Sequence, residues 1–401
     1  MTTADTDTLQ SLISSLDWPT TSREEWRYSR LDTIDLSEYH LPDSAATPAT
    51  SVDPGQQADI VAIPDRAATV VMANGRIVSI DVDPAVAAQG VRVGPLRELD
   101  PDAVLPEPQD AFVELNARLG AALLIDIPRN VTVVHPIVVS RWVSVDGLLA
   151  LPRVMIRSGE NSHATIVEFS GSSTDHALVI PVTTIDLAQA SRLSHVSIQQ
   201  FTSGVNQIGI NAAVVGQQAT LSVGHIALGG NYARMRFDCE LVGRGASGSV
   251  SALYAGNGTQ MHDLRTYQKH LAPDTTSDLV FKGAIDDESH AVYTGMIRIS
   301  PDGRGTNATQ SNRIIKLSPD AWAESVPNLE IEQNDVKCAH ASTVGPIDED
   351  QRFYLESRGI PPEVGERLVV NGFFAEVIDS LPVPSLAARL KAAVENKIGR
   401  A

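Results

Sequence analysis

The sequence has only two cysteines, Cys239 and Cys338, among 401 residues. Such sparse cysteine usage excludes a disulfide framework and is typical of a protein that folds in a reducing compartment. Nowhere do about 18 apolar residues run together, the length that a membrane-spanning helix needs. The first residues carry neither the basic nor the apolar segment that directs export. We therefore expect a cytoplasmic protein without a membrane span.

Basic residues are also scarce. Lys and Arg number 31 against 49 Asp and Glu, which gives a formal net charge of -18. A surface of this charge repels phosphate groups, so neither nucleic acid nor an anionic membrane is expected as the main partner. Apolar residues make up 43% of the chain, which is enough to bury a sizeable core.

The N-terminal part of the chain has helical signals. Good helix formers and aromatic residues in 22–39 predict a small helical piece, and residues 41–48 have the composition of a linker. We assign 1–57 to an N-terminal helical region with its linker.

A hairpin is predicted next. Two β-rich runs, 68–73 and 76–80, flank Asn74-Gly75, a dipeptide that tolerates the positive φ angles of a tight turn. This hairpin lies in a connecting segment that we assign to 58–111.

The middle of the chain contains a repeated sequence pattern. Short β-rich runs alternate there with Gly, Ser, Asn and Asp, and four of the runs recur at intervals of roughly 26 to 29 residues. These runs are 164–167, 193–198, 219–223 and 246–250. A coil of this length cannot bury its own apolar face, so stacked coils would share one core. We predict a right-handed β-helix, or β-solenoid, over 112–335, with a large β-sandwich as the alternative.

The C-terminal part changes to a helical pattern. Asp348 suits a helix N-terminus, Gly359 is placed to end that helix, and Pro362 suits the first turn of the next one. Ser385 is the expected N-cap of a last helix. The predicted fold is therefore mainly β, with small helical domains at both ends, the second one over 336–401.

Cys338 and His340 are the residues with the most chemical information. On a strand they would share one face, with side-chain roots about 7 Å apart, too far for a direct thiolate–imidazole hydrogen bond. Both could still face one cavity, where thiolate and imidazole suit iron or an iron–sulfur species. Two ligands do not complete a site. The alternative is that Cys338 is a small buried apolar residue and His340 a hydrogen-bonded structural one.

Six short blocks in the last third of the chain carry a family resemblance. They are Phe281–Gly283, Thr309–Arg313, Pro327–Ile331, Asp335–His340, Thr343–Gly345 and Phe353–Gly359. In this order they resemble the SufB/SufD family of the SUF iron–sulfur assembly machinery, and Trp26–Tyr28 resembles the family's N-terminal element. The chain is more similar to the SufD-type subunit. SufB-type chains have Cys-Asp where this one has Ser311-Asn312, and His-Glu where it has His340-Ala341.

The resemblance implies a non-catalytic scaffold subunit rather than a stand-alone enzyme. The implied partners are a SufB-type subunit, which pairs through the β-helix core, and the SufC-type ABC ATPase, which binds the C-terminal helices. Apoproteins would accept the product, and the chain could form a homodimer in isolation. The residues expected to dock the ATPase are Phe353, Tyr354, Arg358 and Phe373.

The same resemblance implies a role for the Cys-x-His segment. His340 matches the family's histidine at the junction with the SufB-type subunit, and Cys338 matches a nearby family cysteine. A transient cluster or its iron would be shared with the partner, with no cofactor held tightly by this chain. Ser311 stands where the sister subunit has a thiol, so no persulfide chemistry is expected. The alternatives are a purely structural subunit that supplies no ligand, and a β-helix carbohydrate enzyme that uses paired carboxylates.

Overall fold

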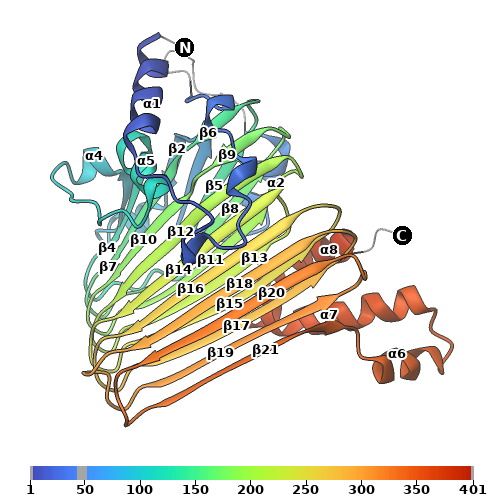
Figure 1. Cartoon of the computed structure of the whole chain (residues 1–401). Helices are drawn as coiled ribbons and strands as arrows, with labels where there is room; N and C mark the ends of the chain where they lie inside the picture. The colour runs from blue at the N-terminus through green and yellow to red at the C-terminus, as the bar shows by residue number, and fades with distance from the viewer. Residues whose placement is uncertain (1–2, 43–51, 399–401) are drawn as a thin grey trace.

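The computed structural model describes residues 3–42 and 52–398. The linker predicted at 41–48 therefore lies almost wholly outside the described residues. Strands account for 45% of the chain and helices for 22%, and the strands wind into a β-solenoid of about 8 turns (Figure 1). The predicted mainly β class is confirmed, and the architecture is the solenoid rather than the sandwich.

Two long sheets form the walls of the solenoid. The ten-stranded sheet contains, in spatial order, β2 (Arg76–Val82), β1 (Ala68–Ala73), β5 (Ile137–Val143), β8 (His163–Ser172), β11 (Arg192–Gln200), β13 (Thr220–Ala227), β15 (Ser247–Gly256), β17 (Thr276–Ile285), β19 (Asn307–Lys316) and β21 (Lys337–Pro346). The eleven-stranded sheet contains β20 (Trp322–Ile331), β18 (His290–Ile299), β16 (Met261–His270), β14 (Tyr232–Leu241), β12 (Val205–Val215), β10 (Val182–Leu187), β7 (Pro152–Ser158), β4 (Ala121–Ile127) and β3 (Arg92–Pro95), with β6 (Leu148–Ala150) and β9 (Ala177–Val179) beside this path.

Successive coils pair in parallel, whereas β1–β2 and β3–β4 at the start of the solenoid are antiparallel. The β1–β2 pair is the predicted hairpin, and its turn residues Asn74 and Gly75 have φ angles of 50° and 78°. The repeated runs of the sequence lie on neighbouring strands of one sheet, from β8 to β15.

One corner of the coils repeats the same backbone turn. Each coil has a residue with positive φ there, and its N–H donates to a carbonyl oxygen of the next coil. These residues are Asn130, Asn161, Ala190, Gln218, Gly245, Asp274 and Gly305. Gly, Asn and Asp tolerate this conformation best, which explains the turn composition seen in the sequence.

Parallel register stacks inward-facing side chains into columns along the solenoid. One column of the ten-stranded sheet consists of Ile137, Ile166, His195, Val223, Val250, Leu279, Gln310 and His340. The apolar members belong to the main core, and each contributes about 1.5–3 kcal/mol by its burial. The column runs from the closed start of the solenoid to its last strand.

The N-terminal helix is not where the sequence predicts it. The α-helix of this part is α1 (Thr3–Ser15), and 22–39 contains only the short 3-10 helices η1 (Glu24–Trp26), η2 (Leu31–Thr33) and η3 (Leu36–Glu38). Two buried guanidinium groups hold the first of these turns. Arg234 donates to the carbonyl oxygen of Glu25 and Arg265 to that of Glu24, both within η1.

Four further helices cover the first coils. They are α2 (Pro54–Val61), α3 (Pro84–Ala87), α4 (Leu96–Leu99) and α5 (Ala111–Leu119). Phe112 of α5 packs with the buried Trp26, so the N-terminal segment and α5 form one layer over the eleven-stranded sheet.

The C-terminal helices are α6 (Glu349–Glu356), α7 (Pro362–Ser380) and α8 (Ala387–Ile398). Strand β21 lies within the segment predicted as helical, so the helices begin at Glu349 rather than at 336. Asp348 caps α6 as expected, and Gly359 has a φ of 78°. Ser385 is not the N-cap of α8, because a 3-10 turn, η4 (Pro384–Leu386), comes first.

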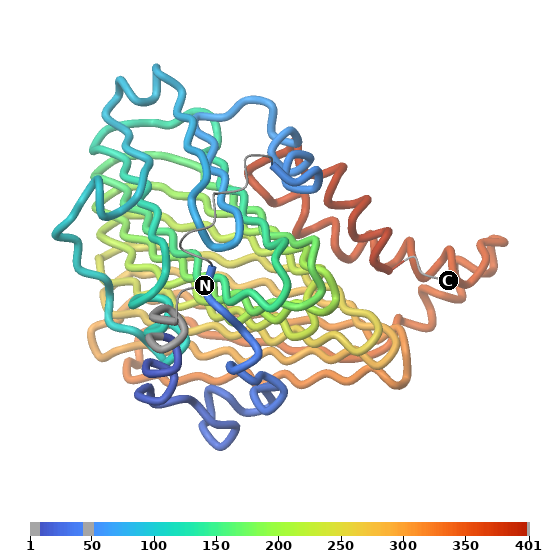
Figure 2. Tube along the Cα trace, turned by 90° about the horizontal axis from the view of Figure 1, so that it is seen from above, coloured from blue at the N-terminus to red at the C-terminus, as the bar shows by residue number. Residues whose placement is uncertain are grey.

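Helices α7 and α8 lie beside the coils, on the outer face of the ten-stranded sheet (Figure 2). Val370 and Phe374 of α7 and Leu390 of α8 pack there against strand residues such as Val196 and Leu253. Within the described part of the chain, no helix is long and apolar enough to cross a membrane.

Candidate functional site at the open end of the solenoid

None of the residues in the described ranges, 3–42 and 52–398, adds a further strand to the last coil of the solenoid. Strands β20 and β21 end the two sheets, and each is paired on one side only, with β18 and β19 respectively. Both strands are ten residues long, and none of their residues is fully buried. Unpaired N–H and C=O groups along such edges can pair with another chain. The end of the stack is therefore a surface suited to continuing both sheets at once.

Cys338 and His340 lie on β21 at this edge. The segment is a strand, and register places both on the inward side, above Ala308 and Gln310 of β19. His340 is exposed, whereas Cys338 is half-buried beside Ile297. Burial raises the pKa of the Cys338 thiol above its ordinary value, which disfavours the thiolate at neutral pH. The two predicted donors thus lie together at the mouth of the solenoid, the open end formed by β20 and β21. They differ in exposure, and the Cys338 thiol is less easily ionised than an ordinary thiol.

The mouth does not hold a complete metal site. Among the residues that the structure describes, no three His, Cys, Asp or Glu side chains gather closely enough to bind a metal ion. Iron held at His340 and Cys338 would need further ligands from outside this chain. The incomplete ligand set noted in the sequence is also incomplete in three dimensions.

Sequence reasoning missed a hydrogen-bond network that fixes the mouth. Ser342 of β21 donates to the Ser325 hydroxyl of β20 at 2.7 Å, and the Asn312 amide of β19 donates to the same hydroxyl at 2.9 Å. These bonds tie the last strands of the two sheets together. Asn312 belongs to a block that carries the resemblance, but its partners could be found only from the register of the coils. Ser311, by contrast, points away from the interior, between the buried Gln310 and Asn312.

A second surface lies on the C-terminal helices. A groove of about 520 Å³ runs between α6 and α7, lined by Asp350, Gln351, Tyr354, Leu355, Leu368 and Val369. Phe353 and Tyr354 are 71% and 55% exposed. The Arg358 guanidinium lies over the Tyr354 ring, 3.5 Å from its centroid. Exposed apolar side chains beside a groove mark an interaction surface.

Phe373, the fourth residue expected to dock the ATPase, lies elsewhere. It is half-buried against the solenoid, and its backbone oxygen accepts a hydrogen bond of 2.8 Å from Lys282 Nζ. The ammonium also lies over the Phe373 ring and pairs with Glu376. Lys282, from a resemblance block with no assigned role, therefore anchors α7 to β17.

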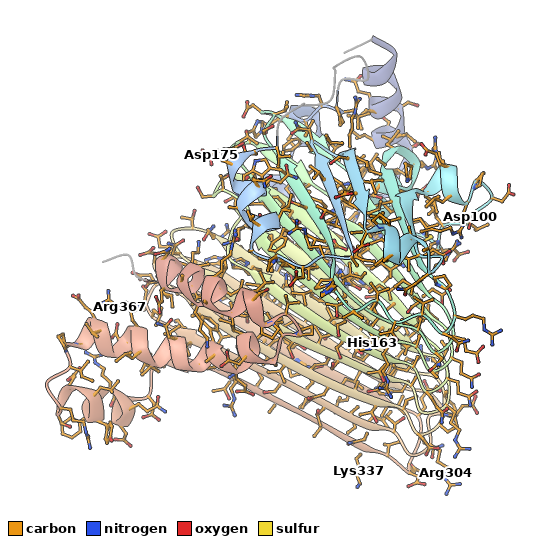
Figure 3. All side chains as sticks on the ribbon, turned by 180° about the vertical axis from the view of Figure 1, so that it is seen from behind. Asp100, His163, Asp175, Arg304, Lys337 and Arg367 are labelled. Carbon is orange, nitrogen blue, oxygen red and sulfur yellow. The ribbon has the colours of Figure 1, made fainter. Side chains whose placement is uncertain are left out.

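The two surfaces are well separated. Figure 3 shows Lys337, at the start of β21, on the lower edge of the coils, and Arg367 of α7 on the helices that project from the side. Helix α7 reaches from the groove to β15 and β17, which precede β19 and β21 in the ten-stranded sheet.

Comparison with known protein families shows which family this chain belongs to. The family model described as SUF system FeS cluster assembly, SufBD core domain, matches residues 142–373, more than half of the chain. The chain belongs to the SufBD family. The matched SufBD core runs from β5 into α7, so it includes most of the coils, the open end and the Lys282 anchor.

Curated SufBD relatives agree. An iron–sulfur cluster assembly SufBD family protein of Mycobacterium tuberculosis is 31% identical over 336 residues, 80% of this chain and 81% of its own length. The iron–sulfur cluster assembly protein SufD of Escherichia coli is 25% identical over 388 residues, 95% of this chain and 89% of its own. SufD of Bacillus subtilis is 26% identical over 282 residues, 70% of this chain and 64% of its own. The resemblance to SufD inferred from the sequence blocks is confirmed.

Proposed function

We propose that this SufBD family protein is a non-catalytic scaffold subunit for iron–sulfur cluster assembly. It pairs through the open end of its solenoid with a SufB-type subunit and holds a SufC-type ABC ATPase on its C-terminal helices. The observation that carries the proposal is the open last coil, where two long edge strands meet and a thiol and an imidazole lie on one face. The cluster is cargo that passes on to apoproteins, and the expected compartment is the cytoplasm.

The edge strands favour a partner of similar architecture. A second solenoid end offers two edges at the same spacing, so both sheets can be continued together by strand addition. Exposed apolar side chains support burial of this end, among them Leu329 and Ile331 on β20 and Val344 on β21. A second copy of this chain could occupy the same edges when the SufB-type partner is absent, which would give a homodimer.

The junction is also where the ligand set would be completed. His340 supplies an exposed imidazole, and Cys338 supplies a thiol two residues away on the same face of the same strand. Imidazole and thiolate both suit iron and iron–sulfur species. Ligands from the partner subunit would fill the remaining positions, so cargo would be held only in the assembled pair.

The helical groove suits the ATPase. Phe353, Tyr354 and Arg358 lie beside the groove between α6 and α7, and α7 is fixed to β17 through Lys282. If ATP favours an arrangement in which two bound ATPases approach each other, α7 would transmit that rigid-body movement to the coils. The junction near His340 would then open or close.

The test is co-expression of the tagged chain with the SufB-type and SufC-type proteins of the same organism, followed by anaerobic purification. We expect one copy of this chain, one SufB-type subunit and two ATPases, with iron and sulfide bound. His340→Ala should keep this stoichiometry and lower the iron and sulfide content. Failure to retain either partner would contradict the scaffold assignment.

A purely structural subunit is the second candidate. The observation that favours it is Cys338, which packs in an apolar cluster and whose pKa is raised by burial. In that case His340→Ala would leave both subunit stoichiometry and iron content unchanged.

A further inference from the structure

Gln310 lies directly beneath His340 in the stack of coils. The two residues are paired in register on β19 and β21. Gln310 is only 2% exposed, yet within the described part of the chain neither Nε2 nor Oε1 of its carboxamide has a hydrogen-bond partner. Because a buried amide without partners is unfavourable, native folds rarely keep one without a reason.

Neighbouring polar side chains are satisfied. Asn312, on the same face of the same strand, donates to Ser325 and accepts from the Tyr254 hydroxyl. His195, in the same column deeper in the solenoid, is bonded to Glu168 at 2.9 Å and to Asn211 at 3.0 Å. The fold therefore provides partners for Asn312 and His195, but not for the Gln310 amide.

The direction of the amide is set by a glycine. A Cβ atom at Gly295 of β18 would collide with both Nε2 and Oε1 of Gln310, so the side chain crosses the interior to the opposite sheet. In the last coil, His340 stacks on Gln310 and Pro327 stacks on Gly295. The Gln310 amide therefore lies one coil below the open end, beneath the space between His340 and Pro327. We call it the floor of the site.

We propose that Gln310 is a further residue of the ligand site, and that its amide N–H donates a hydrogen bond to a sulfide of the iron–sulfur cargo held at His340. This inference rests on the proposed function. The acceptor has to enter through the mouth, because the described side chains around the amide provide none. A sulfide is anionic and accepts hydrogen bonds from amides, and such bonds raise the reduction potential of a cluster.

The test compares two buried glutamines in the purified complex with its SufB-type and SufC-type partners. Gln310→Met keeps the length of the side chain and removes the donor. Gln268→Met is the matched control, because Gln268 is also buried with both amide atoms unpartnered, but the apolar Ile297 stacks directly above it and Leu329 lies above Ile297.

We expect Gln310→Met to weaken iron and sulfide retention about tenfold, the effect of losing one hydrogen bond to a charged acceptor. Any cluster that remains should have a lower reduction potential. Subunit stoichiometry and the thermal unfolding midpoint of the isolated chain should not fall, since no bond within the chain is lost. Gln268→Met should retain iron and sulfide like the wild type.

Four other outcomes would overturn the inference. Equal loss of cargo in both variants would mean that the interior as a whole is disturbed. Loss of the SufB-type partner in Gln310→Met would mean that the amide pairs with that subunit instead. Full retention in Gln310→Met, with loss in His340→Ala, would leave the proposed function standing and reject the role of Gln310. If His340→Ala also retains its cargo, both the ligand role of His340 and the inference that rests on it are wrong.

Discussion

Single buried charges attach distant segments of this chain to the solenoid. Lys282 on β17 holds α7, and Arg234 and Arg265 hold the N-terminal segment around Trp26. Asp263 is hydrogen-bonded to both arginines, and despite burial their charges lower the pKa of its carboxyl. These side chains add polar contacts to the apolar packing that both segments already make with the solenoid.

Lys282→Met should loosen α7. The substitution removes the bond to the Phe373 carbonyl oxygen, the pair with Glu376 and the contact with the Phe373 ring. Because Lys282 is buried, we expect a loss of about 1–3 kcal/mol in the free energy of unfolding. Urea titration of the purified chain measures this loss, and hydrogen exchange should show faster exchange in α7.

The control is Lys269→Met. Lys269 also makes an ion pair, with Glu240 at 2.8 Å, but both side chains are more than one-third exposed. Exposed pairs contribute little, so this variant should stay within about 1 kcal/mol of the wild type. Equal effects of the two substitutions would show that Lys282 is no anchor.

At the scale of elements, the edge strands are the least protected part of the fold. Natural sheets shorten, charge or cover such edges, whereas β20 and β21 are long and carry apolar side chains such as Val344. Val344→Asp should therefore abolish pairing with the SufB-type subunit and any homodimer, because the carboxylate would be desolvated or repelled at the junction. Size-exclusion chromatography with light scattering measures the assembly state.

A matched surface substitution separates pairing from stability. Val242, like Val344, is about two-fifths exposed, at 44% against 40%, but it follows β14 at a turn between coils. Val242→Asp should leave the assembly unchanged. Neither substitution should alter the unfolding midpoint by much. If Val344→Asp still pairs normally, the open end is not the interface.

Elements with local signals could be predicted from the sequence, and those set by distant contacts could not. The hairpin and the coils follow from turn residues whose positive φ angles are local requirements. The position of η1 between 22 and 39 depends on contacts with Arg234 and Arg265, more than 200 residues away. Ser385 has the chemistry of an N-cap, yet Pro384 starts a tighter turn first.

The candidate site also combines residues that local sequence patterns predict with residues that only the whole fold brings together. Alternation along a strand places Cys338 and His340 on one face, and this required no knowledge of the fold. Gln310, Ser325 and Pro327 join them only through the pairing of strands within each sheet and the meeting of the two sheets. A parallel solenoid brings together residues one coil apart, so the register has to be known before the floor of the site can be named.

The whole molecule should lose stability in mild acid. Burial lowers the pKa of both His225 and His262 to about 3, so these histidines stay neutral in the folded chain. In the unfolded chain they take up protons below about pH 6.5. Their contribution is therefore fully present above pH 6.5 and is lost as the pH falls toward 3. At pH 5 the loss amounts to about 2 kcal/mol for each histidine.

Asp59 acts in the opposite direction, because burial raises its pKa to about 6 even though it pairs with Arg389 of α8. The folded chain takes up this proton more readily than the unfolded one, so stability increases as the pH falls from 6 to 4. The increase offsets about 1 kcal/mol of the histidine loss at pH 5. Asp59→Asn removes this offset, and its free energy of unfolding should fall more steeply between pH 7 and pH 5 than that of the wild type. Urea titrations at the two pH values measure both slopes, and parallel slopes would mean that Asp59 is already ionised at pH 5 in the folded chain, held so by Arg389.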